Sequence, residues 1–91
     1  MRIVWTHHSE ERQREWEKRL EITREQVENV LRKPEQIAAG YRGTLVAQSR
    51  CADGLLRVPF VEVGEERKIL TVYWTSKVSK YWEVKDDANS L

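Results

Sequence analysis

The 91-residue sequence contains a single cysteine, Cys51. A lone cysteine cannot form an internal disulfide, and the only histidines that could join it at a metal are His7 and His8. The sequence therefore predicts a fold without a disulfide, without a bound metal and without a cofactor.

Long hydrophobic runs are also missing. The apolar stretch near the N-terminus, Ile3 to Trp5, is far too short for a signal peptide or a membrane span. We therefore expect a cytoplasmic protein that is not inserted in a membrane.

Neither sign of charge dominates, since 16 basic and 15 acidic residues give a net charge of +1. No global field would draw such a protein onto nucleic acid, so any binding of that kind has to be local. The balance of charge counts against a nuclease.

Several catalytic and binding signatures are absent: a Ser-His-Asp order, a glycine-rich phosphate loop, paired metal ligands and a helix-turn-helix. Repeats and low-complexity segments are absent as well. Two possibilities remain, which are metal-free acid–base chemistry on an anion and no chemistry at all.

The composition that is present is typical of one small globular domain. Hydrophobic residues make up 40% and charged residues 34%, and four Trp and three Tyr offer large areas for burial. We expect a single domain over residues 1–85, followed by a polar tail over residues 86–91.

The N-terminal half predicts a short strand and two helices. After a strand over Arg2 to Thr6, either Thr6 or Ser9 can cap a mostly charged helix over Glu10 to Arg19. A second helix over Arg24 to Lys33 is marked by the capping-box spacing of Thr23 and Gln26, by apolar residues at helical spacing and by the stop at Pro34. The apolar residues are Val27, Val30 and Leu31.

The C-terminal half predicts three antiparallel strands. One runs over Thr44 to Cys51, the next begins at Leu55, and Ile69 to Thr75 has the best strand composition in the chain. Asp53-Gly54 is a two-residue hairpin signal, because a type I′ turn needs positive φ at both central positions. Before the first of these strands, the segment from Gly40 to Gly43 predicts a loop or a bent strand entry.

The predicted hairpin fixes a register. It places Ala47 opposite Phe60 and Arg50 opposite Arg57. A three-residue loop over Gly64 to Glu66 would then place Leu56 beside Trp74, and Arg57 opposite Tyr73. In the last strand, alternation predicts that Leu70, Val72 and Trp74 face the core and that Ile69, Thr71, Tyr73 and Thr75 face the other way.

The predicted fold class is α+β, with an N-terminal strand, a helical pair and a three-stranded antiparallel meander in one sheet. The helices cover the sheet face that carries Phe60 and Trp74. The opposite face carries a mostly polar set of residues: Gln48, Arg50, Arg57, Thr71, Tyr73 and Thr75.

The Arg50 and Arg57 pair is the most informative feature of that polar face. Two like charges across a hairpin are unfavourable unless an anion such as phosphate lies beside them. The alternative is that both arginines turn apart and pair with acidic residues such as Glu62. Tyr73 next to them either stacks a base or donates a proton, or it simply fills the sheet face.

Basic and aromatic residues alternate after the last strand, at Lys77, Lys80, Tyr81 and Trp82. This pattern suits single-stranded RNA. The alternative is that the lysines protect a sheet edge while the two aromatics dock the tail on the core. His8 is a candidate general base near neutral pH, with a solvated or structural histidine as the alternative.

Short motifs along the chain together resemble a small bacterial family, domain-of-unknown-function family 4258, which is often grouped with the BrnT and RelE/ParE toxin superfamily. The resemblance extends over nearly the whole chain up to Trp82 and rests on these segments: Thr6-His7-His8 with Arg12, Arg19 to Thr23, Val27 to Ile37, Gly40 to Gly43, Leu55 to Val58 and Thr71 to Trp82.

The resemblance implies a RelE-like fold and a toxin-type endoribonuclease, in which a ribose 2′-OH attacks the neighbouring phosphate without a metal. It implies that Arg50 and Arg57 hold the scissile phosphate, and that Tyr73, Lys77 or Lys80 assists proton transfer. RNA contacts would come from the same basic residues with Tyr81. His8 and Arg12 match the family pattern without an assigned role. An antitoxin protein would be the partner.

The near-neutral net charge departs from ribosome-dependent toxins of that superfamily, which are usually strongly basic. A second interpretation is therefore a non-catalytic interaction module of the same fold, dimeric or bound to a partner. In that case the aromatic residues of the polar face would be interface anchors.

Overall fold

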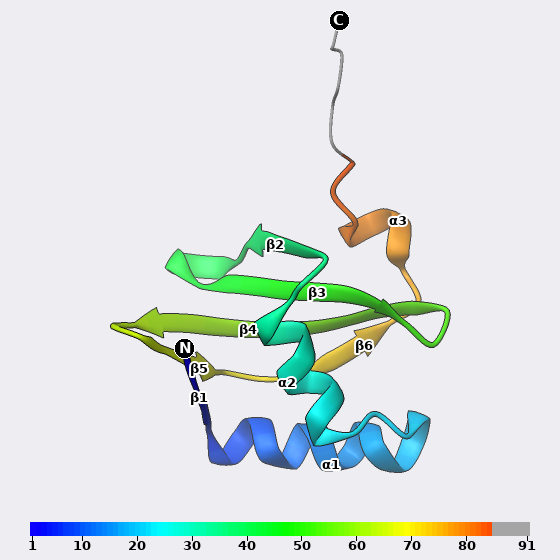
Figure 1. Ribbon diagram of the computed structural model, residues 1–91. Helices are drawn as coiled ribbons and strands as arrows, with labels where there is room; N and C mark the ends of the chain where they lie inside the picture. Colours follow the sequence, from blue (N-terminus) through cyan, green and yellow to red (C-terminus); the bar gives the residue numbers. More distant parts are fainter. Residues whose placement is uncertain (85–91) are drawn as a thin grey trace, which may run out of the picture.

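The computed structural model of the protein describes residues 1–84 and shows a mixed α+β fold, which confirms the predicted class (Figure 1). In chain order the elements are β1 (Arg2–Trp5), α1 (His7–Leu20), α2 (Arg24–Arg32), β2 (Gln36–Ala39), the 3-10 turn η1 (Tyr41–Gly43), β3 (Leu45–Cys51), β4 (Gly54–Val63), β5 (Glu66–Ile69), β6 (Tyr73–Thr75) and α3 (Val78–Tyr81).

The six strands form one sheet in the order β1-β5-β4-β3-β2, with β6 paired to β4 beyond the end of β5. Only the β1 and β5 pair is parallel. The N-terminal strand therefore extends the meander as predicted. No helix within residues 1–84 is long and apolar enough to cross a membrane. The predicted tail, residues 86–91, lies outside the described residues.

Both helices begin at capping boxes. Thr6 rather than Ser9 is the N-cap of α1: its hydroxyl accepts from the Ser9 N–H at 3.1 Å, and the Ser9 hydroxyl accepts from the Thr6 N–H at 2.9 Å. The same reciprocal pair joins Thr23 and Gln26 at the start of α2, as predicted. The sequence therefore placed the start of α2, whereas it left the cap of α1 open between Thr6 and Ser9. The first helix begins at His7, three residues before the predicted Glu10.

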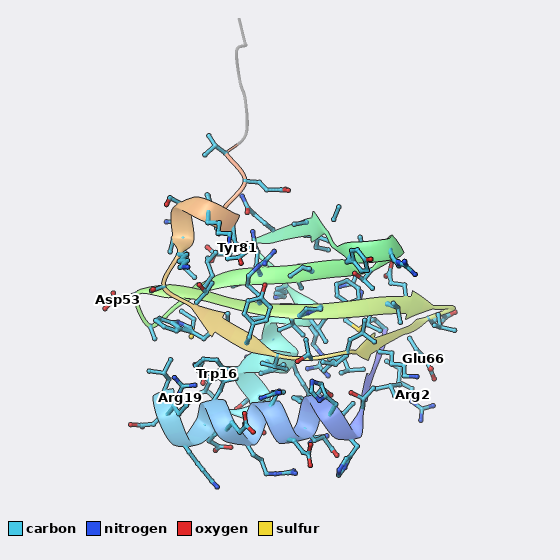
Figure 2. All side chains as sticks on the ribbon, turned by 180° about the vertical axis from the view of Figure 1, so that it is seen from behind. Arg2, Trp16, Arg19, Asp53, Glu66 and Tyr81 are labelled. Atoms are coloured by element: carbon cyan, nitrogen blue, oxygen red, sulfur yellow. The ribbon has the colours of Figure 1, made fainter. Side chains whose placement is uncertain are left out.

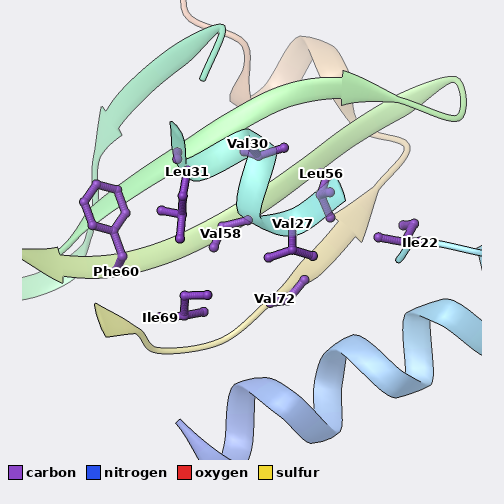
Figure 3. Close-up of a cluster of buried hydrophobic side chains, with 10 residues drawn as sticks. Ile22, Val27, Val30, Leu31, Leu56, Val58, Phe60, Ile69 and Val72 are labelled. Carbon is purple, nitrogen blue, oxygen red and sulfur yellow. The ribbon is translucent and has the colours of Figure 1, made fainter. Parts of the chain in front are cut away.

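The core lies between the helices and one face of the sheet (Figure 3). Phe60 is fully buried together with Val27, Val30 and Leu31 of α2, and Trp74 packs at the edge of this cluster. The Trp74 indole N–H donates to the Cys51 carbonyl at 2.7 Å. The helices therefore cover the predicted face.

The predicted strand over Ile69 to Thr75 is interrupted, and the interruption changes which residues are buried. From Phe60 back to Arg57 the chain moves three residues along β4, whereas its partner moves four, from Ile69 to Tyr73. This extra residue makes a bulge between β5 and β6. As a result both Ile69 and Val72 are fully buried, so the prediction that Ile69 faces away from the core is wrong.

The bulge also explains why one predicted register is correct. The loop after β4 has two residues rather than the predicted three, since Val63 pairs with Glu66. The extra residue in the bulge compensates for the shorter loop. Leu56 therefore pairs with Trp74, and Arg57 with Tyr73, as expected.

The register between β3 and β4 differs from the prediction by two residues. The turn is centred on Ala52 and Asp53, whose φ values are 50° and 62°, rather than on Asp53 and Gly54. Arg57 consequently pairs with Gln48, so the predicted Arg50 partner is wrong. A shift of two residues keeps every side chain on its predicted face.

Gly54 serves packing rather than turn geometry. It pairs with Cys51 inside the ladder, and a Cβ atom there would collide with the Trp74 ring and with the Thr75 carbonyl oxygen. The absence of a side chain lets β6 approach the start of β4 closely.

Two elements were not predicted. β2 forms just before the predicted loop over Gly40 to Gly43, in a segment to which the sequence assigned no element, and it pairs antiparallel with β3 at the edge of the sheet. α3 is a single helical turn after β6 and lies near the hairpin that joins β3 and β4 (Figure 1). Both elements position side chains of the candidate site.

We expect Phe60→Ala to lower the free energy of unfolding by about 3–5 kcal/mol, because it removes the largest fully buried side chain and leaves a cavity. Val63→Ala on the same strand is the matched control: Val63 is 60% exposed, so its loss should change stability by less than about 0.5 kcal/mol. Urea unfolding measures both. Equal effects of the two substitutions would contradict this assignment of the core.

Candidate functional site

Arg57 is the most unusual residue of the sheet face that turns away from α1 and α2. It lies in the middle of β4 and is only 7% exposed. Its strand partners are Gln48 of β3 on one side and Tyr73 of β6 on the other. The sheet itself therefore brings these three side chains together.

Polar and aromatic groups surround the Arg57 guanidinium. Its Nε–H donates to the Gln48 amide oxygen at 2.8 Å, and its Nη1 donates to the Tyr73 hydroxyl. The Tyr81 ring lies over it, with its centroid 4.1 Å from Cζ. The guanidinium is thus fixed in position by groups from β3, β6 and α3.

Gln48 determines how Arg57 is held. Its side chain is fully buried, and its amide nitrogen donates to the Gln36 side-chain oxygen at 2.7 Å and to the Tyr81 carbonyl at 3.0 Å. With acceptors beside the nitrogen and a cationic donor beside the oxygen, only one orientation of this amide is satisfied.

The segment that follows α3 closes over this face. Gln36 accepts from the Glu83 N–H at 3.0 Å and donates to the Glu83 carbonyl at 2.6 Å. Figure 2 shows Tyr81 on the sheet face that is seen from behind, away from α2. The sequence left open whether Tyr81 and Trp82 are free for RNA or dock the C-terminal segment. In the structure Tyr81 docks this segment through its ring and its carbonyl, and the Trp82 ring stacks with the Arg50 guanidinium.

The positive charges that gather here make no ion pair in the part of the chain that the structure describes. Within residues 1–84, Arg50, Arg57, Lys77 and Lys80 make no ion pair with Asp or Glu. The alternative partner suggested by the sequence, Glu62, pairs with Arg67 instead, at 3.1 Å. A buried cation without an anion is costly, so this arrangement favours an anionic ligand.

The other predicted site residues differ in how close they come to Arg57. Lys80 is near, because its Nζ lies 5.2 Å from the centroid of the Tyr81 ring. Lys77 is exposed at the start of α3, where its N–H donates to the Thr75 hydroxyl at 3.1 Å. His8 is exposed on α1, at the opposite edge of the molecule from α3 (Figure 1), so the structure does not bring it to Arg57.

Arg50 lies on the same face as Arg57 but has a different neighbour. It pairs with Leu55 across the hairpin, and its guanidinium lies over the Trp82 ring at 4.4 Å. Two arginine–aromatic stacks therefore stand side by side, Arg57 with Tyr81 and Arg50 with Trp82. We call Arg57, Gln48, Tyr73, Tyr81 and Lys80 the Arg57 site.

Other chemistry has little support in the described part of the chain. Within residues 1–84, no group of three His, Cys, Asp or Glu side chains is arranged to hold a metal ion. Burial raises the pKa of the Cys51 thiol, which makes this cysteine a poor nucleophile. The groups best placed for catalysis or binding are therefore Arg57, Tyr73 and Tyr81.

Comparison with known proteins gave no match: neither a scan against protein-family models nor searches of curated proteins and of solved structures found a relative. The resemblance to the toxin superfamily therefore stays a prediction, and so does the RelE-like arrangement of the fold.

We expect sulfate to bind at the Arg57 site and to shift the backbone amide signals of Gln48, Tyr73 and Tyr81 in an NMR titration. Arg57→Met should weaken this binding about tenfold or more, because it removes charge-assisted hydrogen bonds. Arg14→Met is the control for net charge, since Arg14 is an exposed arginine of α1. Shifts that persist in Arg57→Met would show that the anion binds elsewhere.

Proposed function

We propose that the protein is a metal-independent endoribonuclease of the bacterial toxin type, which acts on RNA in the cytoplasm and holds the scissile phosphate at the Arg57 site. One observation carries the proposal: the Tyr81 ring contacts two cations, Arg57 at 4.1 Å and Lys80 at 5.2 Å, and neither has a carboxylate partner within residues 1–84. An RNA phosphate would supply the missing negative charge.

Arg57 has hydrogen-bonding capacity to spare for such a phosphate. A guanidinium carries five N–H donors, and only two of them have acceptors within residues 1–84. When a ribose 2′-OH attacks the phosphorus, its proton passes to solvent water, the new O–P bond forms as the bond to the 5′-oxygen of the next nucleotide breaks, and negative charge builds up on the phosphoryl oxygens. Donors held rigidly beside those oxygens stabilise that transition state more than the ground state.

Tyr73 is suited to the proton transfer that completes the cleavage. Its hydroxyl accepts a hydrogen bond from Arg57, so its own proton is available to another group. We assign Tyr73 as the general acid that protonates the departing 5′-oxygen, which belongs to the nucleotide that follows the attacking ribose. Lys80 and Lys77, both exposed, supply positive charge for neighbouring phosphates of the strand.

An antitoxin protein would control this activity by covering the same face. Such a partner would carry acidic side chains, because the residues it has to cover include Arg50, Arg57, Lys77 and Lys80. This part of the proposal rests on the charge of the face alone.

A non-catalytic interaction module is the second candidate, and the burial of Arg57 favours it. At 7% exposure, with the Tyr81 ring 4.1 Å from its Cζ, Arg57 offers little surface to a ligand. In that case Arg57 would stabilise the fold, and Tyr81 and Trp82 would be anchors for a protein partner.

For the ribonuclease, we expect purified protein to cleave RNA and Arg57→Ala to reduce the rate about a hundredfold or more, which is the usual effect of losing one transition-state donor. Expression of the wild type should arrest growth, and Arg57→Ala should relieve the arrest. Arg14→Ala, with the same change in net charge, should leave both readouts unchanged. Circular dichroism is used to check that each variant is folded.

A wild-type protein that is harmless when expressed, and that leaves RNA intact with and without ribosomes, would instead support the interaction module. If folded Arg57→Ala still cleaves RNA, the protein is a ribonuclease but its catalytic residues are others. His8, Lys80 and Tyr81 would be the next to test.

A further inference from the structure

Trp82 differs from the other three tryptophans in having no partner for its indole N–H within residues 1–84. Trp5 donates to the Glu28 carboxylate at 2.8 Å, Trp16 to the Val72 carbonyl at 3.2 Å, and Trp74 to the Cys51 carbonyl at 2.7 Å. Half-buried indoles usually find an acceptor, so a Trp82 indole N–H that has none within residues 1–84 suggests a ligand.

The Trp82 ring is nevertheless held in a defined place. Its neighbour Tyr81 is bound through its carbonyl by Gln48, and its other neighbour Glu83 is bound through both backbone groups by Gln36. The Arg50 guanidinium lies over the ring at 4.4 Å. The backbone N–H of Arg50 donates to the Glu35 carboxylate at 2.6 Å, which fixes the position of this residue. A ring positioned in this way loses little entropy when it binds a ligand.

We infer that Trp82 and Arg50 form a subsite for a nucleobase of single-stranded RNA, next to the phosphate held at the Arg57 site. The inference rests on the proposed function and adds the form of the substrate to it. An unpaired base can stack on the indole or on the guanidinium plane, and the indole N–H can donate to an acceptor on its edge.

The register supports a single strand that reaches both places. Arg50 pairs with Leu55, and Leu55 lies two residues before Arg57 on the same face of β4. Residues related in this way are diagonal neighbours in a sheet, about 7–8 Å apart. One strand can therefore place a phosphate at Arg57 and an adjacent base at Trp82. A duplex keeps its bases stacked inside and would not present one here.

The test compares a ligand that has bases with one that has only phosphates. Full-length protein is titrated into a short fluorescein-labelled 2′-O-methyl oligouridylate, which cannot be cleaved because it has no free 2′-OH, and inorganic polyphosphate is used as the competitor. We expect Trp82→Ala to weaken oligouridylate binding about tenfold, the usual effect of losing one base stack, and to leave polyphosphate binding unchanged. Trp82→Phe, which keeps a ring but loses the indole N–H, should weaken oligouridylate binding less than Trp82→Ala does.

Two further variants separate base recognition from docking of the segment. Trp82→Leu keeps an apolar side chain without a ring, and we expect it to lose the oligouridylate selectively, as Trp82→Ala does. Tyr41→Ala is the matched control, because Tyr41 is 76% exposed in another arginine–aromatic pair, with Arg42 at 5.3 Å, at the other end of β3. It should have no effect on either ligand.

Failure of the subsite differs from failure of the proposed function. If the Trp82 variants bind oligouridylate like the wild type, or lose both ligands equally, the base subsite is refuted, while weaker polyphosphate binding by Arg57→Ala would still support the phosphate site. If Arg57→Ala leaves both ligands unaffected, the phosphate site is refuted, and the inference that depends on it fails too. Wild-type protein that binds neither ligand would overturn both.

Discussion

The hydrogen bond from Arg57 to Gln48 organises the polar face of the sheet. It places the buried Arg57 cation opposite the buried Gln48 amide. The amide nitrogen in turn donates to the Gln36 side chain and to the Tyr81 carbonyl, and these bonds fix the C-terminal segment. Because a positive charge is expensive to bury, the arrangement is stable only if its donors are satisfied. Tyr73 and Tyr81 meet part of that need, and we propose that an anion meets the remainder. The same interactions that fix α3 on the sheet therefore also define the Arg57 site.

The parts of the fold that depend on local interactions could be predicted from the sequence. The start of α2 follows from its reciprocal capping bonds, and its buried face follows from the spacing of its apolar residues, whereas the sequence left the start of α1 open between Thr6 and Ser9. Tertiary contacts decided the remainder. Ala52 takes a positive φ that the sequence does not signal, because Gly54 is needed where Trp74 packs closely, and this moved the turn by one residue. The bulge after Ile69 is likewise set by packing against β4.

The site was partly predictable for a related reason. Alternation along β3 and β4 depends only on whether residues are an even or odd number apart, so Gln48, Arg50 and Arg57 were placed on one face although their register was wrong by two residues. Tyr73 was placed opposite Arg57 correctly because the bulge offsets the shorter loop. Gln48 was placed on that face but its role was missed. Its hydrogen bond to Arg57 can be inferred only when the cross-strand pairing of the two residues is known. The sequence left open whether Tyr81 docks on this face, since the docking depends on bonds from Gln36 and Gln48 to backbone far away in the chain. A polar residue in the middle of an apolar strand, on the same face as an arginine, is the signal that could have pointed to Gln48.

The most direct test is arginine side-chain NMR on protein labelled with ¹⁵N at arginine. In this structure the Arg57 Nε–H is buried and donates to Gln48, so its proton should exchange with water far more slowly than that of an exposed arginine such as Arg14. Its signal should also shift when the 2′-O-methyl oligouridylate is added. Rapid exchange of the Arg57 Nε–H, together with no response to the oligonucleotide, would contradict both the buried network and the anion site built on it.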